Sequence, residues 1–161
     1  MGVIPVDHTL QLEIENLYAR YVHCIDDDRL EEWPGFFAED GRYQITTAEN
    51  HERSLPIGIF FASSRGMLQD RVSALREANI YEPQRYRHTV TSILVTGNEG
   101  GIVRAQANFQ VIRSMHDGAM DLFATGRYLD KISGRGPAMK FAERLVILDN
   151  KRIDTLLAIP I

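Results

Sequence analysis

The strongest constraint on the fold is a change in the spacing of apolar residues along the chain. From Leu10 to Ile25, apolar side chains recur at a helical spacing, which predicts an amphipathic helix. From Val103 to Val111, apolar and polar residues alternate instead, which predicts a strand with one buried and one solvated face. Helices followed by a run of such strands predict an α+β fold, with helices packed on one face of an antiparallel sheet.

The remaining elements are separated by turn residues. We expect Asp7 or Thr9 to cap the first helix, and Pro34-Gly35 to break a short helical turn that follows it. The later elements are expected to be a strand at 41–47, a polar loop at 49–54, a helix at 64–78, and strands at 88–96, 103–111, 120–132, 140–148 and 152–159. The helix at 64–78 should bury Met67, Leu68, Val72 and Leu75. Without a linker or a repeat, residues 1–161 are predicted to form a single domain.

Charge and composition exclude several classes of function. The 161 residues include 18 basic and 22 acidic side chains, which gives a net charge of −4. Nucleic-acid partners need a surplus of basic charge, so none is predicted. No segment approaches the roughly 18 apolar residues of a membrane span, and the first residues do not resemble a signal peptide. We therefore expect a cytoplasmic protein without a membrane partner.

The single cysteine, Cys24, limits the cofactors that this chain can hold. One cysteine cannot form an intrachain disulfide, a four-cysteine zinc site or the paired thiolates of an iron–sulfur cluster. The five histidines are not spaced to place two metal ligands on one helix or turn. We expect no metal-binding or cofactor-binding residue in this chain.

Several segments, in this order, resemble one family. They are the residues Asp27, Asp28, Trp33, Phe36, Phe37, Glu39, Asp40 and Tyr43, and the runs 73–82, 85–88, 123–131 and 154–160. The first set resembles the nuclear transport factor 2-like, or SnoaL-like, superfamily. The later runs resemble the small (beta) subunits of aromatic-ring-hydroxylating dioxygenases, over nearly the whole chain. This resemblance implies a cone-shaped, curved antiparallel sheet wrapped by N-terminal helices.

The resemblance also implies a function. It predicts the structural small subunit of a multicomponent Rieske non-haem iron oxygenase that hydroxylates an aromatic carboxylate, with salicylate favoured over terephthalate and anthranilate. A large (alpha) subunit would carry the 2Fe–2S Rieske cluster and the mononuclear Fe(II), and a reductase would supply electrons from NAD(P)H. The small subunit would form a trimer within an assembly of three large and three small subunits. No catalytic residue is then expected in this chain.

An alternative keeps the fold but gives the chain its own reaction. Relatives of the SnoaL and scytalone dehydratase type use a tyrosine, an aspartate and a histidine as general acid and base inside the cone. Tyr21, Asp26 and His88 lie at comparable places, which would make this chain a stand-alone isomerase or dehydratase. The competing interpretation is that Tyr21 and His88 are core residues whose polar atoms find hydrogen bonds.

Two groups of residues are candidates for subunit interfaces. Arginine outnumbers lysine 15 to 3, and arginine suits two-point pairing with carboxylates at an interface. The last residues are almost wholly apolar, so a strand at 152–159 would have two apolar faces, one of which a neighbouring subunit could cover. The candidates are Arg65, Arg71, Arg76, Arg85, Arg87, Leu156, Leu157, Ile159 and Ile161.

Overall fold

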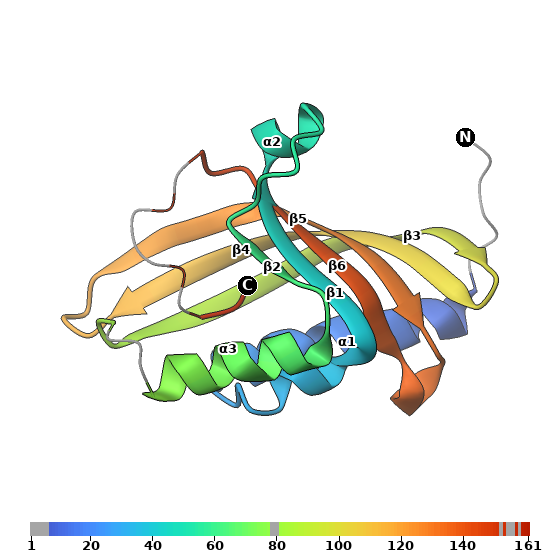
Figure 1. The fold of residues 1–161 in the computed structure, drawn as a ribbon, viewed down its shortest axis with the longest axis horizontal. Coiled ribbons are helices and arrows are strands. Elements are labelled where there is room, and N and C mark those ends of the chain that lie inside the picture. The colour runs from blue at the N-terminus through green and yellow to red at the C-terminus, as the bar shows by residue number, and fades with distance from the viewer. Residues whose placement is uncertain (1–6, 78–80, 152, 154–156, 158) are drawn as a thin grey trace.

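The computed structural model describes residues 7–77, 81–151, 153, 157 and 159–161. Figure 1 shows a long curved sheet with helices against one of its faces. The elements are α1 (His8–Asp26), η1 (Trp33–Phe36), β1 (Phe37–Thr47), α2 (Ala48–Glu52), β2 (Phe60–Ala62), α3 (Arg65–Glu77), β3 (Gln84–Glu99), β4 (Ile102–Met115), β5 (Met120–Ser133), η2 (Gly136–Ala138) and β6 (Lys140–Leu148). The predicted α+β class is confirmed.

Helix α1 forms where the apolar spacing predicts it. The Asp7 carboxylate caps the helix by accepting hydrogen bonds from the backbone N–H groups of Thr9 at 3.0 Å and Leu10 at 3.2 Å. Of the two candidate caps, Asp7 therefore holds this position, and Thr9 is already helical. The buried face of α1 consists of Leu10, Ile14, Leu17, Tyr18, Tyr21, Val22, Cys24 and Ile25.

The six strands lie in the order β2-β1-β6-β5-β4-β3. Strands β3 to β6 are antiparallel neighbours, as expected, but β1 pairs with β6 in parallel, with Tyr43 opposite Arg144. The expectation of a wholly antiparallel sheet is therefore wrong at this one pair. After β1 the chain forms β2 beside it, and α3 then leads to β3 at the far edge of the sheet. The three reversals from β3 back to β6 bring β6 alongside β1 in the same direction.

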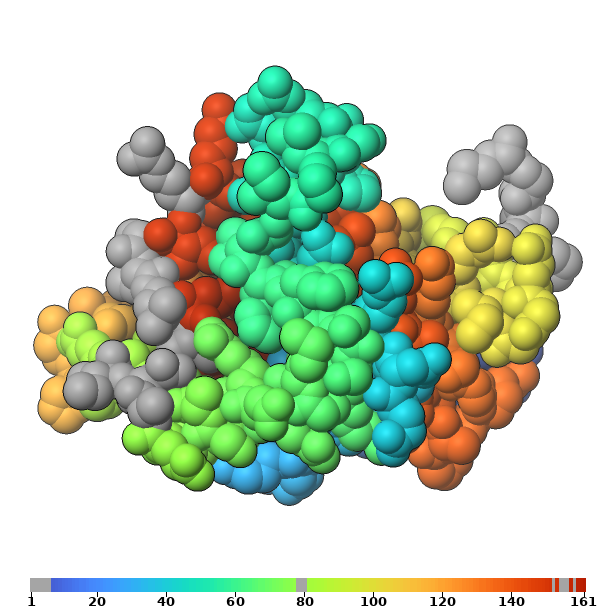
Figure 2. All heavy atoms as spheres, viewed as in Figure 1, coloured from blue at the N-terminus to red at the C-terminus, as the bar shows by residue number. Residues whose placement is uncertain are grey.

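Irregular strand pairing accompanies the curvature. The register shifts between Thr91 and Leu94 in β3, between Val111 and Ile112 in β4, and between Lys131 and Ile132 in β5. Such bulges bend strands and increase their twist. In Figure 2, α3 and the segment that carries α2 and β2 form much of the near surface. The described part of the chain contains no helix long and apolar enough to cross a membrane.

Three local expectations need correction. A short helix, α2, replaces part of the loop expected at 49–54, because the Thr47 hydroxyl caps it by accepting from the Asn50 N–H. In α3, Leu68, Val72 and Leu75 are buried, but Met67 is 43% exposed because it lies outside the inner stripe.

The third correction concerns the expected strand at 152–159. Arg152, residues 154–156 and Ala158 lie outside the described residues, and Ile153, Leu157 and Ile159 are not in a strand. Leu157, Ile159 and Ile161 instead bury their side chains in the core of their own chain. Their apolar character therefore does not require a neighbouring subunit, and the interface role of Leu156 falls outside what the structure describes.

Candidate functional site

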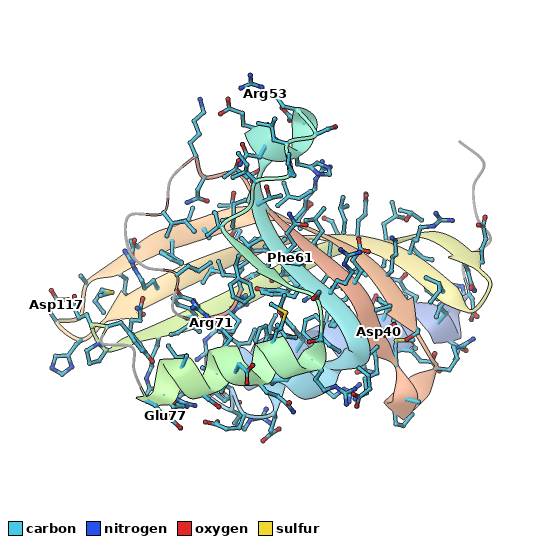
Figure 3. All side chains as sticks on the ribbon, in the orientation of Figure 1. Asp40, Arg53, Phe61, Arg71, Glu77 and Asp117 are labelled. Carbon is cyan, nitrogen blue, oxygen red and sulfur yellow. The ribbon has the colours of Figure 1, made fainter. Side chains whose placement is uncertain are left out.

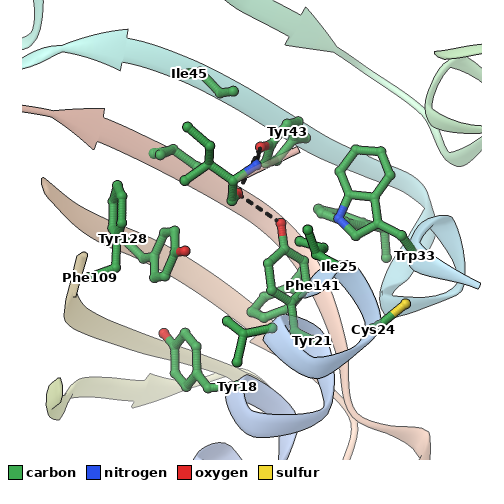
Figure 4. Packing of buried hydrophobic residues seen from close by; sticks show 14 of the residues in the cluster. Tyr18, Tyr21, Cys24, Ile25, Trp33, Tyr43, Ile45, Phe109, Tyr128 and Phe141 are labelled. Carbon is green, nitrogen blue, oxygen red and sulfur yellow. Dashed lines mark hydrogen bonds between the residues drawn. The ribbon is translucent and has the colours of Figure 1, made fainter. Parts of the chain in front are cut away.

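The interior of the cone is closed by the last described residues of the chain. The Tyr21 hydroxyl from α1 and the Tyr43 hydroxyl from β1 both donate to the Ile161 carbonyl oxygen, at 3.1 and 2.8 Å (Figure 4). The Ile161 N–H donates to the Tyr43 oxygen at 3.2 Å. Beside Tyr43, the described residues enclose a cavity of about 10 Å³, which has room for no more than a single water molecule.

A second contact holds this segment from the helical side. Arg71 on α3 extends from the helix toward the interior (Figure 3) and donates to the Leu157 carbonyl oxygen at 2.5 Å. Its guanidinium also lies over the Phe60 ring, 5.2 Å from the centroid. Leu157 and Ile161 are therefore held by side chains from α1, β1 and α3.

A buried ion pair lies deeper in the cone, between neighbouring strands. Arg144 on β6 donates two hydrogen bonds to the Asp130 carboxylate on β5, from Nε at 2.9 Å and from Nη2 at 2.7 Å. The Tyr18 hydroxyl from α1 donates to the same carboxylate. Both charged side chains are fully buried, so this pair is stable only because each charge has its partner.

Aromatic rings surround the Arg144 guanidinium. Its central carbon lies 3.9 Å from the Tyr128 ring centroid, 4.0 Å from that of Phe141 and 4.3 Å from that of Tyr21. The Nη1 group of Arg144 and the Tyr128 hydroxyl are both buried and have no hydrogen-bond partner among the described residues. The ring faces supply the favourable electrostatic contact on this side of the cation.

These surroundings determine the protonation states in the cone. Burial raises the pKa of Tyr21, Tyr43 and Tyr128, and the same effect, together with the charge of Asp130, raises the pKa of Tyr18. Burial alone would lower the pKa of Arg144, but the charge and hydrogen bonds of Asp130 outweigh it and raise the pKa. The tyrosines therefore remain neutral hydrogen-bond donors and do not act as bases near neutral pH.

The three residues of the predicted acid–base site are only partly brought together. The Asp26 carboxylate accepts from the His88 backbone N–H at 2.8 Å and lies 2.6 Å from His88 Nδ1, with both side chains almost fully buried. His88 Nε2 is buried and has no partner among the described residues. The Tyr21 hydroxyl donates to Ile161 instead. The structure therefore shows an Asp–His pair joining α1 to β3.

A groove of about 590 Å³ lies at the surface beside this pair. Asp26, Arg85, Arg87 and Ile159 are among its lining residues, but the ring of His88 is not. Because His88 is screened from the groove, an acid–base reaction by the pair would require the wall of the groove to move.

The donor atoms of the chain do not fit an iron–sulfur or iron site. The described residues contain no group of three His, Cys, Asp or Glu side chains that could hold a metal ion. A Rieske cluster needs two cysteines and two histidines, and the sequence has one cysteine. Burial raises the pKa of the Cys24 thiol to about 11, and the thiol donates to the Arg29 carbonyl oxygen. Cys24 is therefore an unreactive core residue.

The five arginine candidates divide into two sets. Arg65 donates to the Phe37 carbonyl oxygen and to Glu39, Arg71 donates to Leu157, and Arg76 pairs with Asp28 and Glu31. These three anchor α3 to its own chain. Arg85 and Arg87 are exposed on β3 and make no ion pair with another described residue.

Sequence reasoning missed Tyr18, Asp130 and Arg144 as a buried network. The signal was present in the alternation of the strands. Asp130 stands between the buried residues Tyr128 and Ile132 at spacing two, and Arg144 precedes buried Val146 at the same spacing. Charged residues at inward positions of two neighbouring strands indicate a buried pair, because an isolated buried charge is too costly.

A curved sheet that forms a cone around helix α1 is the nuclear transport factor 2-like fold. In this chain the cone is filled by aromatic rings and by Leu157, Ile159 and Ile161, which form a C-terminal plug. The chain of naphthalene 1,2-dioxygenase that it resembles in fold has a TM-score of 0.76 at 18% identity, covering 96% of this chain and 86% of that one. Residues 20–155 match the family described as ring hydroxylating beta subunit, and the chain belongs to this family.

Individual relatives agree with this assignment. The chain is 40% identical to the beta 2 subunit of the terephthalate 1,2-dioxygenase terminal oxygenase component of Comamonas sp., covering 94% of this chain and 98% of the relative. It is 37% identical to the anthranilate 1,2-dioxygenase small subunit of Burkholderia cepacia, over the full length of both. A solved beta subunit, assigned to a ring-hydroxylating dioxygenase of Novosphingobium aromaticivorans, has a TM-score of 0.86 and 40% identity, covering 94% of this chain and 96% of that one.

Proposed function

We propose that this beta subunit, as a single domain over residues 1–161, has a structural and non-catalytic role in its oxygenase. The observation that carries the proposal is the filled cone. The hydroxyls of Tyr21 and Tyr43 both donate to the Ile161 carbonyl oxygen. The cavity beside Tyr43 is far smaller than the 300 Å³ or so of a typical ligand pocket. The groove of about 590 Å³ at the surface is lined by Asp26 but not by the His88 ring, so the Asp–His pair does not face a shared substrate site.

The proposed partner is a large (alpha) subunit, since the relatives are subunits of multi-subunit dioxygenases. We assign the Rieske cluster and the mononuclear Fe(II) to that large subunit, with electrons from NAD(P)H delivered through a reductase. The donor set of the present chain supports this division, because its one cysteine cannot ligate such a cluster. The proposed assembly contains three large and three small subunits.

The proposed substrate class is an aromatic carboxylate. Terephthalate and anthranilate, the substrates in the names of the two relatives, both carry a carboxylate on an aromatic ring. Neither relative favours salicylate, which stays a prediction from the sequence. The stand-alone isomerase or dehydratase is not proposed, because Tyr21 does not join Asp26 and His88 in an open site.

Co-expression with a large oxygenase subunit encoded beside this chain tests the proposal. We expect the two chains to purify together, and we expect iron and turnover of an aromatic carboxylate in the complex. The small chain purified alone should contain no stoichiometric iron. Failure to co-purify, full turnover by the large subunit alone, or about one iron per small chain after chelation would contradict the proposal.

A further inference from the structure

The interior of the cone contains more buried hydrogen-bond donors than its own acceptors satisfy. Besides the hydroxyls of Tyr21 and Tyr43, three buried groups have no hydrogen-bond partner in the part of the chain that the structure describes. They are Trp33 Nε1, the Tyr128 hydroxyl and Arg144 Nη1. An indole and a guanidinium can donate but not accept. A buried donor without an acceptor is costly, so an acceptor that reached these groups would bind favourably.

These groups lie together around the C-terminal plug. Tyr21 and Tyr43 donate to the plug directly, and the Trp33 ring lies 5.2 Å from the Tyr43 ring. The Arg144 guanidinium lies 4.3 Å from the Tyr21 ring and 3.9 Å from the Tyr128 ring. Figure 4 shows the Tyr128 hydroxyl directed toward Tyr21. We name this region the donor chamber, and it consists of Tyr21, Trp33, Tyr43, Tyr128 and Arg144.

The charge of Arg144 makes the donor chamber favourable for an anion. Burial raises the pKa of Tyr21 and Tyr128, and the Arg144 charge opposes this rise more strongly than the Asp130 charge adds to it. The ion pair with Asp130 uses Nε and Nη2 of Arg144 and leaves Nη1 without a partner. Hydrogen bonds from such donors to a carboxylate are roughly twice as strong as those to a neutral carbonyl oxygen.

The walls and the size of the space fit a small aromatic molecule. Trp33, Tyr43, Phe60 and Arg71 line the small cavity that remains beside the plug. Loss of one large apolar side chain from a core leaves a cavity of about 150 Å³, so the three side chains of the plug fill a space on the order of 300–450 Å³. This is the size of a small ligand pocket. The hydrogen bonds that hold the plug all end on its backbone, so they do not select its side chains.

We propose that the donor chamber binds a small aromatic carboxylate in place of the C-terminal plug. The carboxylate accepts from the donors that have no partner in the plugged state and from the tyrosine hydroxyls that otherwise hold the Ile161 carbonyl oxygen. The aromatic ring packs against the rings of Trp33 and Phe60. The chamber supplies donors and no base, so this site binds its ligand without reaction and is compatible with a non-catalytic subunit. The inference goes beyond the proposed function and does not depend on it.

Fluorescence of the purified small chain tests the proposal. Trp33 is the only tryptophan in the sequence and lies in the donor chamber, so its emission reports on the occupant of the chamber. Benzoate is the probe, and benzamide is the uncharged probe of nearly the same shape. We expect a saturable change in emission with benzoate. Benzamide should bind at least about tenfold more weakly, because its hydrogen bonds are not charge-assisted.

Two substitutions should change the benzoate affinity in opposite directions. Tyr128→Phe should weaken binding by about fivefold or more, because it removes a donor to the carboxylate. Ile159→Val should strengthen binding by about twofold or more, because it weakens the packing of the plug that benzoate displaces. Ile14→Val is the matched control, since Ile14 is equally a core residue but lies about two helical turns from Tyr21 on α1. Circular dichroism should show that all three variants are folded.

Each result decides for or against the donor chamber. No saturable change in either the wild-type chain or Ile159→Val overturns the proposal, and so does benzamide binding as tight as that of benzoate. An unchanged benzoate affinity in Tyr128→Phe places the probe elsewhere on the chain, and the proposal is then wrong. If Ile14→Val strengthens binding as much as Ile159→Val, general loosening of the core explains the effect and release of the plug does not.

Discussion

Arg144 and Asp130 face each other across β6 and β5 as a two-point ion pair in which neither side chain has any exposed surface. Such a pair contributes little over a well-packed apolar pair, but its loss leaves one charge buried without compensation. Tyr18 depends on the same carboxylate, so the pair also fixes α1 to the sheet.

Replacing one partner of this pair should be costly. We expect Arg144→Met to lower the free energy of unfolding by roughly 3–5 kcal/mol, because the Asp130 carboxylate stays buried. Arg53→Met is the control, since its pair with Glu49 is exposed and should contribute less than about 1 kcal/mol. Urea unfolding measures both. Equal effects of the two variants would show that the buried pair has no special role.

The C-terminal plug can be tested with two tyrosines that differ in their hydrogen bonds. Tyr43→Phe removes a hydroxyl that bonds both the carbonyl and the N–H of Ile161, and we expect a loss of about 1–3 kcal/mol in unfolding free energy. Tyr128→Phe removes a buried hydroxyl that has no partner among the described residues, so we expect no loss. The prediction fails if Tyr128→Phe is the more harmful change.

Stability should fall at high pH. Burial in the folded state raises the pKa of Cys24 to about 11 and also raises the pKa of Tyr18, Tyr21, Tyr43 and Tyr128. In the unfolded chain a cysteine has a pKa of about 8.5 and a tyrosine a pKa of about 10. The unfolded chain therefore releases these protons first, and the urea midpoint should decrease as pH rises above about 9. Cys24→Ala should flatten the first part of this decrease. A midpoint that is constant up to about pH 11 would contradict the prediction.

Gly126 is expected to tolerate no side chain. An added Cβ would lie 2.0 Å from the Ile147 carbonyl oxygen and 3.1 Å from the Phe109 ring, and the first of these is backbone that cannot move aside easily. We expect Gly126→Ala to cost about 1–3 kcal/mol or to reduce soluble yield. At Gly35 a Cβ meets nothing within 4 Å, so Gly35→Ala should change stability by less than about 1 kcal/mol. Thermal unfolding of the two variants decides the matter.

The Asp26–His88 pair and Tyr21 should support structure and not turnover. We expect His88→Ala and Tyr21→Phe to lower stability by roughly 1–3 kcal/mol each, because each removes a buried hydrogen bond. Turnover per assembled oxygenase complex should be unchanged within about twofold. A loss of about a hundredfold with normal assembly would mean that these residues transfer protons, and the non-catalytic role would have to be abandoned.

The sequence predicts the elements well where local rules decide them. The helical stripe from Leu10 and the alternation from Val103 give α1 and β4 directly. It does not predict the parallel pairing of β1 with β6, because no local pattern records which strand a segment will meet about 100 residues later. The fate of Leu157 and Ile159 was missed for a related reason. An apolar run predicts burial, but whether its own chain or a neighbour buries it depends on the tertiary fold.

The candidate site was predictable only in part. The sequence analysis grouped Asp26 with His88, and their side chains lie 2.6 Å apart where α1 meets β3. Tyr21 does not join them, because its hydroxyl donates to the carbonyl oxygen of Ile161, which is 140 residues away in the sequence. Asp130 and Arg144 show the opposite case, in which the spacing within each strand carried the information but the pairing of the strands was needed to interpret it.

The parallel pairing of β1 with β6 also has a consequence for synthesis of the protein. Tyr43 on β1 meets Arg144 on β6, so β1 leaves the ribosome roughly 5–20 s before its partner strand at ordinary elongation rates. During that interval the β1 backbone groups that will pair with β6 can form hydrogen bonds only with water or a chaperone, and the side chains of Tyr43 and Ile45 remain exposed. Contacts of such long sequence separation also slow folding itself. Slow translation of the last third of the gene would prolong this aggregation-prone interval, and we expect it to lower the yield of soluble subunit.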